Sequence, residues 1–379
     1  MNILIVRSSA NKVNKNGYNL QEIGLGKAFV DKGMNCDIIY SNLGERSYKE
    51  EIYIGHNGCK LNILWTRLIF KVLNNGFYKE LFYKGFFEKY DYVILSDYIQ
   101  LMNYRISCIV PEKCILYQGP YKDIRKFVQY IYDIFFLKNF KTNVETSLTK
   151  SNLAKFYLEE KGFKNVHTIG VGLDIENIEQ TCKYNHDEDS YLKKIHKKIN
   201  GRKVLLYIGV LEERRNIKFL FDIVKNILES NLDVVLLMVG NGKKTKVNEY
   251  FNYMRSIGIE ENVIWIEKIS QGQIKKLYAL SNVFVLPTKY EIFGMVILES
   301  MYFGIPVVTS LNGGSSMLIE NEENGYILED FIVEEWSNRI LFLLNNENIQ
   351  KKIGKRSNID ICGKFKWGNI VDNIIKNIK

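Results

Sequence analysis

The sequence has few of the residues that build cross-links, metal centres and Pro-rich linkers. Its six cysteines are scattered and none forms a Cys-x-x-Cys pair, which argues against a disulfide framework or a zinc ribbon and favours reduced cytoplasmic thiols. Its four histidines lie far apart, without metal-ligand spacing, and only four prolines occur in 379 residues. We therefore expect no metal centre and no resident cofactor.

Long hydrophobic runs are also missing. No segment reaches the ~18 consecutive apolar residues of a membrane-spanning helix. The opening stretch, residues 1–7, is shorter than a secretory hydrophobic region, which needs roughly 7–15 apolar residues. It predicts a buried first strand, and we expect a cytoplasmic protein.

The length and composition indicate two globular domains, at roughly 150 residues per domain. Hydrophobic residues make up 46% and charged residues 25% of the chain, which excludes disorder and fibrous structure. The net charge of +9 is uneven. Residues 1–170 hold 24 Lys+Arg and 16 Asp+Glu, and residues 171–379 hold the remaining 28 and 27. The first half is therefore the basic half.

Both halves show short apolar strands that alternate with helices, which predicts parallel βαβ units with both faces of each sheet covered. In the first half we expect strands at 3–6, 36–40, 92–95 and 114–117, and a helix over 20–32. In the second half we expect strands at 204–208, 234–239, 263–266, 283–286 and 306–309, and helices over 216–230, 271–280 and 293–303. The polar, Lys-rich segment 184–202 shows no strand pattern and is expected to be an exposed excursion.

One segment of the second half carries most of the chemical information. A buried strand ends at Pro287, a short loop carries Glu291, and Gly294 begins a helix that contains Glu299. The free N–H groups at the start of that helix suit a phosphate. Two glutamates eight residues apart are common on solvated helices, but Glu299 lies in an apolar helix, where a carboxylate needs a partner. A ligand hydroxyl is one such partner.

Around these residues the sequence resembles the signature of glycosyltransferase family 4, whose members are retaining, nucleotide-sugar-dependent enzymes of GT-B fold. The resemblance is carried by Glu291-x-Phe293-Gly294-x4-Glu299-x4-Gly304-x-Pro306 and covers most of residues 165–330, including Asn312-Gly313-Gly314 and Gly240-Asn241-Gly242. It implies two Rossmann-like, doubly wound α/β domains that face each other across a cleft. We expect the acceptor-binding domain over 1–168, joined by a returning helix at 360–379, and the donor-binding domain over 169–359.

The resemblance also implies roles for individual residues. Glu299 would bind the ribose hydroxyls, and Glu291 the transferred sugar. Arg215 and Arg214 would neutralise the diphosphate, because Arg215 matches a family Lys position. Further donor-binding positions would be Phe293, Gly294, Met295 and Val296 at the helix start, Lys268 and Ile269 near the base, and Gly17 on the loop after the first strand, where a turn without a ligand is an equal alternative.

Three positions depart from the family pattern. Val210 stands where an Arg is expected, Met317 where a Glu is usual, and Gln118 where many members carry a His that faces the transferred sugar. Glutamine can hydrogen-bond a hydroxyl but cannot act as a general base. We therefore expect Gln118 to take the place of that His, so that Gln118 and Glu291 are the two predicted catalytic residues.

Two aromatic and basic stretches lie in the first half, at 64–87 and 125–136. Mixed aromatic, apolar and Lys/Arg residues are typical of helices that lie in a membrane interface. Helices that cover the sheet while their Lys heads reach water give the same composition. The net charge of this half favours peripheral contact with anionic lipid at the inner face of the cell membrane.

The resemblance, taken with these patterns, implies a metal-independent enzyme. It would move a sugar from a UDP- or GDP-sugar to a saccharide or lipid-linked acceptor in bacterial surface polysaccharide or glycoconjugate synthesis. A nucleotide-sugar epimerase of the same shape and a non-catalytic glycosyltransferase-like partner subunit remain as alternatives. No recognition motif supports nucleic-acid binding.

Overall fold

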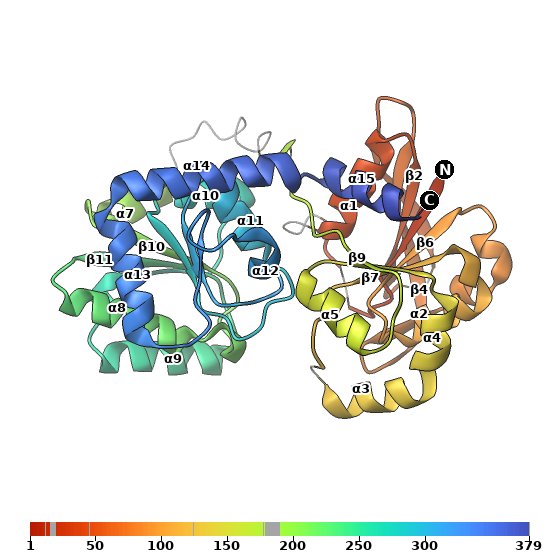
Figure 1. The fold of residues 1–379 in the computed structure, drawn as a ribbon, viewed down its shortest axis with the longest axis horizontal. Helices are drawn as coiled ribbons and strands as arrows, with labels where there is room; N and C mark the ends of the chain where they lie inside the picture. Colours follow the sequence, from red (N-terminus) through yellow and green to blue (C-terminus); the bar gives the residue numbers. More distant parts are fainter. Residues whose placement is uncertain are drawn as a thin grey trace. The chain divides into compact units, whose positions relative to one another are not determined.

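A computed structural model describes residues 1–11, 13–15, 20–44, 46–123, 125–176, 178 and 190–378. The chain forms two compact units (Figure 1). Unit 1 comprises Met1–Asp174 with Phe365–Lys379, and unit 2 comprises Ile175–Lys364. The two units are described separately below.

Unit 1 is built on a nine-stranded sheet with the order β3-β4-β2-β1-β6-β7-β8-β9, and β5 pairs with β4. The strands from β4 to β9 along this order are parallel, and β3 and β5 are antiparallel to β4. The strands are β1 (Asn2–Val6), β2 (Asn35–Asn42), β3 (Tyr48–Ile54), β4 (Lys60–Val72), β5 (Asn75–Tyr78), β6 (Tyr92–Ser96), β7 (Cys114–Gln118), β8 (Thr146–Thr149) and β9 (Val166–Thr168).

The helices of unit 1 cover this sheet. They are α1 (Gln21–Asp31), α2 (Leu101–Ile109), α3 (Lys126–Tyr132), α4 (Lys138–Asn143), α5 (Asn152–Glu160) and α15 (Trp367–Ile378). A π-helical turn over Asp133–Leu137 joins α3 to α4. Chain order reverses between β1 and β6, so the loops that follow these two strands meet at a topological switch point, where doubly wound folds bind their ligands.

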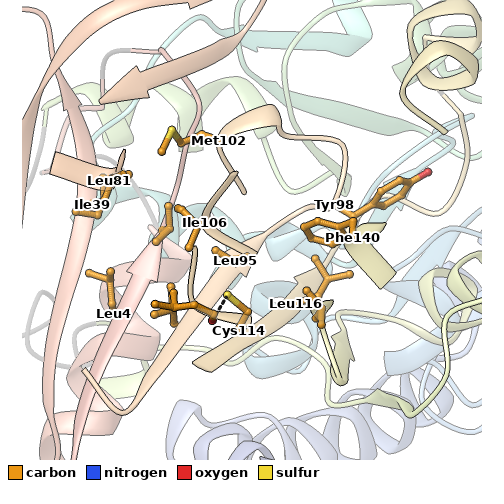
Figure 2. Close-up of a cluster of buried hydrophobic side chains, with 14 of the residues drawn as sticks. Leu4, Ile39, Leu81, Leu95, Tyr98, Met102, Ile106, Cys114, Leu116 and Phe140 are labelled. Atoms are coloured by element: carbon orange, nitrogen blue, oxygen red, sulfur yellow. Dashed lines mark hydrogen bonds between the residues drawn. The ribbon is translucent and has the colours of Figure 1, made fainter. Parts of the chain in front are cut away.

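A continuous hydrophobic core lies in unit 1 (Figure 2). Leu4 and Leu95 from neighbouring strands pack with Met102 and Ile106 of α2, and all four are fully buried. At one end of the cluster Tyr98 lies beside Phe140 of α4. This packing fixes the loop between β6 and α2, which carries Tyr98, against the sheet.

The helix α15 belongs to unit 1 although it follows unit 2 in the chain. It lies along α1 (Figure 1), and its buried Trp367 lies against Gly24 and Gly172, where a Cβ would come within 3 Å of the indole ring. Lys32 and Asp372 add an ion pair of 2.6 Å between the two helices. Glycine at positions 24 and 172 therefore makes the space that this large side chain occupies.

Unit 2 contains a six-stranded, fully parallel sheet of order β12-β11-β10-β13-β14-β15. The strands are β10 (Lys203–Ile208), β11 (Val234–Val239), β12 (Val263–Ile266), β13 (Val283–Leu286), β14 (Val307–Thr309) and β15 (Tyr326–Ile327). Most of these residues are buried apolar ones, as expected for parallel strands covered on both faces. Chain order reverses between β10 and β13, which places a second switch point there.

Helices cover the sheet of unit 2. They are α7 (Ser190–Ile199), α8 (Ile217–Glu229), α9 (Lys244–Ser256), α10 (Gln271–Ala279), α11 (Met295–Tyr302), α12 (Ser315–Leu318), α13 (Val333–Asn345) and α14 (Glu347–Lys364). The segment 184–202 was expected to be an exposed excursion. Its residues 190–199 form α7, whose Ile195 and Ile199 are buried, and residues 184–189 lie outside the described part.

The helical interpretation of residues 64–87 is wrong. The segment forms most of β4, then β5 and two short 3-10 turns at Lys79–Phe82 and Lys84–Phe87. Its β-branched and aromatic residues favour strands, and β4 pairs with both β2 and β3. The second aromatic stretch, 125–136, is helical as predicted. Among the described residues no helix is long and apolar enough to cross a bilayer.

Candidate active site

A cluster of charged side chains in unit 2 lies at the switch point of its sheet. The loop after β10 carries Arg214 and Arg215, and the loop after β13 carries Glu291. Main-chain groups join the two loops, because the Lys289 N–H donates to the Arg214 carbonyl over 2.7 Å. The Thr288 hydroxyl donates to the same carbonyl over 3.1 Å. The fold thus brings together three of the residues predicted from sequence.

Glu291 forms ion pairs with both arginines. Its Oε2 atom lies 2.6 Å from Arg215 Nη2 and 3.3 Å from Arg214 Nη1. The side chains of Glu291 and Arg215 are only 13% and 9% exposed, whereas that of Arg214 is 37% exposed. Arg214 also pairs with Glu212 and donates to the Tyr290 carbonyl. Arg215 is therefore the buried cation of the cluster, and Arg214 is the exposed one.

Arg215 has more donors than partners. Its Nε and Nη1 atoms are buried and have no hydrogen-bond acceptor among the described residues. A buried donor without an acceptor costs free energy, most of all on a charged group. An anion that accepts from these two N–H groups would remove that cost, and guanidinium forks match phosphate oxygens well. The pair Arg215–Glu291 is thus suited to receive an anionic ligand.

Glycines shape the loop that carries Glu291. Gly294, at φ +79°, is the N-cap of α11, a conformation that glycine adopts at little cost. A Cβ on Gly313 or Gly314 would stand 1.8 Å from the Ile292 carbonyl oxygen or 1.5 Å from that of Phe293. The Gly313 N–H also donates to the Glu291 carbonyl over 3.0 Å. The Asn312-Gly313-Gly314 motif therefore supports the Glu291 loop by direct backbone contact.

Glu299 lies on α11 and is fully buried. Its Oε2 atom accepts a hydrogen bond of 2.9 Å from the Tyr278 hydroxyl of α10. At the start of the same helix Phe293 is buried, and Met295 and Val296 are half-buried. The first-turn N–H groups of a helix have no intrahelical acceptors. This carboxylate and these N–H groups thus belong to a single short helix.

Lys268 and Ile269, predicted near the base, lie on the loop after β12. With Glu267, Ser270 and Gln273 they line an open hollow of about 610 Å³. Lys268 is exposed and Ile269 is half-buried. Ser270 and Gln273 form a capping box at the start of α10, which holds the loop in place. Because parallel strands end at the same edge of a sheet, this hollow and the Glu291 loop share the carboxyl edge of unit 2.

Gln118 ends β7 in unit 1 and is buried. Its Oε1 atom accepts from the Tyr98 N–H over 3.1 Å, and its Nε2 atom donates to the Pro120 carbonyl over 2.9 Å. The amide therefore holds two loops together at both of its ends. Gly17 lies outside the described residues.

Sequence reasoning missed Asp97, which follows β6 at the switch point of unit 1. It has a φ of +63°, an uncommon conformation that often marks a functional site. Its Oδ1 atom accepts from the Gly119 N–H, and Asn103 donates to its carbonyl. A polar cavity of about 410 Å³ opens here, lined among others by Arg7, Glu22, Asp97 and Lys150. A polar residue directly after a buried strand was the available signal.

Burial raises the pKa of Asp97 above its ordinary value of 3.8, although the nearby charge of Lys150 and the Gly119 N–H act in the opposite direction. A carboxyl with a raised pKa in the folded state adds stability below pH 3.8 and loses it as the pH rises through the folded value. An Asn side chain does not titrate, so Asn at this position would lose no stability as the pH rises.

We therefore expect Asp97→Asn to raise the Tm of unit 1 at pH 7 by roughly 2–4 °C, the shift that about 1 kcal/mol produces in a unit of this size. Asn also tolerates a positive φ well, and that gain is independent of pH. The difference between variant and wild type in thermal melts should thus shrink from pH 7 towards pH 3. A difference that stays constant over this range would contradict the assigned burial of the charge.

No group of three or more possible metal ligands occurs among the described residues. An Asp-x-Asp triplet, which can hold a divalent cation, does occur once in the sequence, at Asp187-Glu188-Asp189, outside the described part. Because this triplet is present, the sequence does not exclude a divalent cation, and metal-independent chemistry stays a prediction.

Two doubly wound sheets, each with polar side chains at its switch point, define a two-domain α/β protein of the class that binds ligands at strand ends. Residues 189–359 match the family model of glycosyl transferases group 1. This region, somewhat less than half of the chain, belongs to that family, glycosyltransferase family 4, and the two parallel sheets have the GT-B fold. The signature residues named above lie inside the matched region.

Relatives and solved structures agree with this assignment. The spore coat protein SA of Bacillus subtilis is 28% identical, over 47% of this chain and 48% of that protein. The capsular polysaccharide biosynthesis glycosyltransferase CapM of Staphylococcus aureus is 27% identical, over 59% and 56%. The match spans about half the length of these curated relatives.

Similarity to solved structures extends over the whole chain. A glycosyltransferase from Rickettsia africae superposes with a TM-score of 0.73 at 16% identity, over 100% of this chain and 97% of that one. Anabaena HepE in complex with UDP superposes with a TM-score of 0.74 at 16% identity, over 100% and 99%. At such identities the superpositions establish the fold.

Proposed function

We propose that the protein transfers a sugar, with retention of configuration, from a UDP- or GDP-sugar to a saccharide or lipid-linked acceptor in bacterial surface polysaccharide or glycoconjugate synthesis. The observation that carries this proposal is the buried pair of Arg215 and Glu291 at the switch point of unit 2, where two donors of Arg215 lack acceptors within the described part of the chain. A nucleoside diphosphate supplies the anion that these donors lack.

The donor is assigned to the carboxyl edge of the unit 2 sheet. Arg215 and Arg214 would bind the diphosphate, and Glu299 would accept hydrogen bonds from the ribose hydroxyls. The N–H groups from Gly294 to Val296 would assist at the phosphate or the sugar. The base would occupy the hollow beside Lys268 and Ile269. HepE, which has this fold, has been crystallised with UDP and glucose.

In the ion pairs of the structure, Glu291 occupies part of the arginine cluster. When a diphosphate takes the arginine donors, the Glu291 carboxylate becomes available for the hydroxyls of the transferred sugar. The bond between the anomeric carbon and the diphosphate oxygen then breaks while the acceptor oxygen bonds to the same face. The departing phosphate oxygen takes the acceptor proton, so no protein general base is required, in keeping with Gln118.

The acceptor is assigned to unit 1, which carries most of the net positive charge. Exposed apolar side chains lie on two of its segments, at the end of β4 and along α3 with its π-helical turn. We include peripheral contact of this surface with anionic lipid in the proposal. The relatives named for capsule and spore coat are consistent with a surface glycoconjugate as product.

Donor binding can be tested by thermal shift with UDP-, GDP- and ADP-sugars. A ligand at 100 times its Kd should stabilise the fold by about 2.7 kcal/mol. Glu299→Gln keeps an acceptor for the Tyr278 hydroxyl but removes the charge, and we expect it to weaken the binding of the preferred nucleotide roughly tenfold or more. Stabilisation by no nucleotide, or stabilisation of equal size in the variant, would overturn the donor assignment.

A non-catalytic partner subunit is the second candidate, because both ends of the Gln118 amide are used in structural hydrogen bonds and Val210 is exposed at a position expected to hold Arg. Such a subunit would bind the nucleotide without releasing it from the sugar. Donor hydrolysis, measured as free UDP or GDP over hours, distinguishes the two functions.

A further inference from the structure

A second, mostly apolar cavity lies in unit 1, beside the polar one. Its volume is about 540 Å³, within the range of cavities that bind small molecules. Its walls come from the end of β4, the loop between β6 and α2, and α3. Apolar members of the lining include Val72, Leu73, Ile99, Leu101, Val128 and Ile131.

A partly buried polar network holds two tyrosines that line this cavity, Tyr98 and Tyr157. The Tyr98 hydroxyl lies 3.1 Å from Asp133 Oδ1 and 3.1 Å from the Tyr157 hydroxyl. Lys161 bonds to Asp133 over 2.5 Å and to Asp123 over 3.3 Å. These bonds tie α3 and its π-helical turn to the core, so the cavity is formed by anchored elements. Burial alone would lower the pKa of Lys161, but its bonds to Asp133 and Asp123 raise it.

The apolar and the polar cavity share part of their lining. Asn74, Asp97 and Gln100 line both. Gln100 Oε1 is buried there without a hydrogen-bond partner among the described residues. A molecule that fills both cavities must therefore be apolar at one end and rich in hydroxyl or phosphate groups at the other.

Several residues that line the apolar cavity are exposed, and two of these are basic. Leu73 and Phe127 line it and are 62% and 76% exposed. Lys122 and Arg125 line it as well, and both are exposed. An apolar rim with cations beside it suits a ligand that carries a negative charge next to a hydrocarbon chain.

We propose that the apolar cavity holds the hydrocarbon chain of a lipid-linked phosphate acceptor, with Lys122 and Arg125 at its phosphate groups and the acceptor saccharide in the polar cavity. This inference rests on the proposed function and narrows its acceptor to one class. The acceptor sugar would then lie at Asp97, the phosphate groups would follow it, and the hydrocarbon chain would lie among the apolar lining residues.

Soluble prenyl diphosphates test this proposal by calorimetry without membranes. Farnesyl diphosphate should bind at least about tenfold more tightly than geranyl diphosphate, because a longer chain buries more apolar surface, and inorganic diphosphate should bind far more weakly than either. Val128→Trp fills the cavity and should weaken farnesyl diphosphate binding by about tenfold or more. Binding without any dependence on chain length would overturn the proposal.

A matched pair of variants distinguishes ligand binding in the cavity from non-specific binding to exposed apolar side chains. Phe127 lines the cavity, whereas Phe135 is 68% exposed on the π-helical turn and does not line it. Phe127→Ser should weaken farnesyl diphosphate binding several-fold, and Phe135→Ser should leave it unchanged. Equal loss of binding in both variants would contradict the assigned site. The proposal would also be contradicted if the protein bound no lipid but self-associated, and if Val128→Trp abolished that self-association.

The outcomes also separate this inference from the proposed function. UDP-sugar binding that depends on Glu299, together with no prenyl diphosphate binding, would keep the donor site and discard the lipid cavity. Chain-length-dependent prenyl binding without nucleotide binding would do the reverse. Dodecyl phosphate binding as tightly as farnesyl diphosphate would assign the cavity to alkyl chains in general.

Discussion

Replacement of Arg215 with methionine is expected to lower kcat/KM for the donor by about 10²–10³, the usual effect of losing one charged donor from a desolvated site. Methionine keeps much of the side-chain volume but removes the positive charge and its N–H groups. Glu291 keeps Arg214 as a partner, so the variant should remain folded. Steady-state release of the nucleotide diphosphate measures the effect.

The matched control is Arg214→Met. Arg214 pairs with the same carboxylate but is more exposed and also bonds to Glu212 and the Tyr290 carbonyl. Exposed ion pairs contribute little because solvent screens them, and we expect a loss of less than about tenfold. Equal losses in the two variants would show that burial of Arg215 has no special role.

Gly314→Ala is expected to destabilise unit 2 by about 3 kcal/mol or more. The added Cβ would stand 1.5 Å from the Phe293 carbonyl oxygen, and main-chain atoms cannot move aside as a flexible side chain can. The Glu291 loop would have to shift, so transfer activity should fall together with stability. Thermal and urea unfolding measure the first effect, and nucleotide-sugar turnover the second.

Gly363→Ala serves as its control. Gly363 lies in α14, and a Cβ there meets no atom within 4 Å. Alanine favours a helix over glycine by about 0.5–1 kcal/mol, so this variant should be slightly more stable than wild type. If Gly314→Ala melts at the wild-type temperature, Gly314 does not lie in close contact with the Phe293 carbonyl group.

The parallel strands could be predicted closely because each is a short run of buried apolar residues. Val234–Val239, Val263–Ile266 and Val283–Leu286 have the predicted bounds. The error at 64–87 has a physical cause. In β4 the first half is buried and the second half extends with exposed Ile69, Phe70 and Val72, so the alternating pattern of a half-buried strand is lost.

The candidate site was predictable where neighbouring residues in the chain carry it, as around Glu291 and Glu299. The pairing of Arg215 with Glu291 depends on β10 and β13 being neighbours in the sheet. The order of strands in a sheet cannot be predicted directly from their order in the sequence. Asp97 was missed for a related reason, because its importance comes from a positive φ and from a cavity that segments distant in the chain form together.

The placement of α15 has a consequence for biosynthesis. Unit 1 needs Trp367 to fill the space above Gly24 and Gly172, but a ribosome adds this residue only after it has completed all of unit 2. Unit 1 is therefore synthesised first but completed last. Unit 2 can fold while the apolar face of α1 that α15 later covers is still exposed. Newly made chains should depend on chaperones during this interval, and ribosome-bound chains ending near residue 360 should expose that face to proteases.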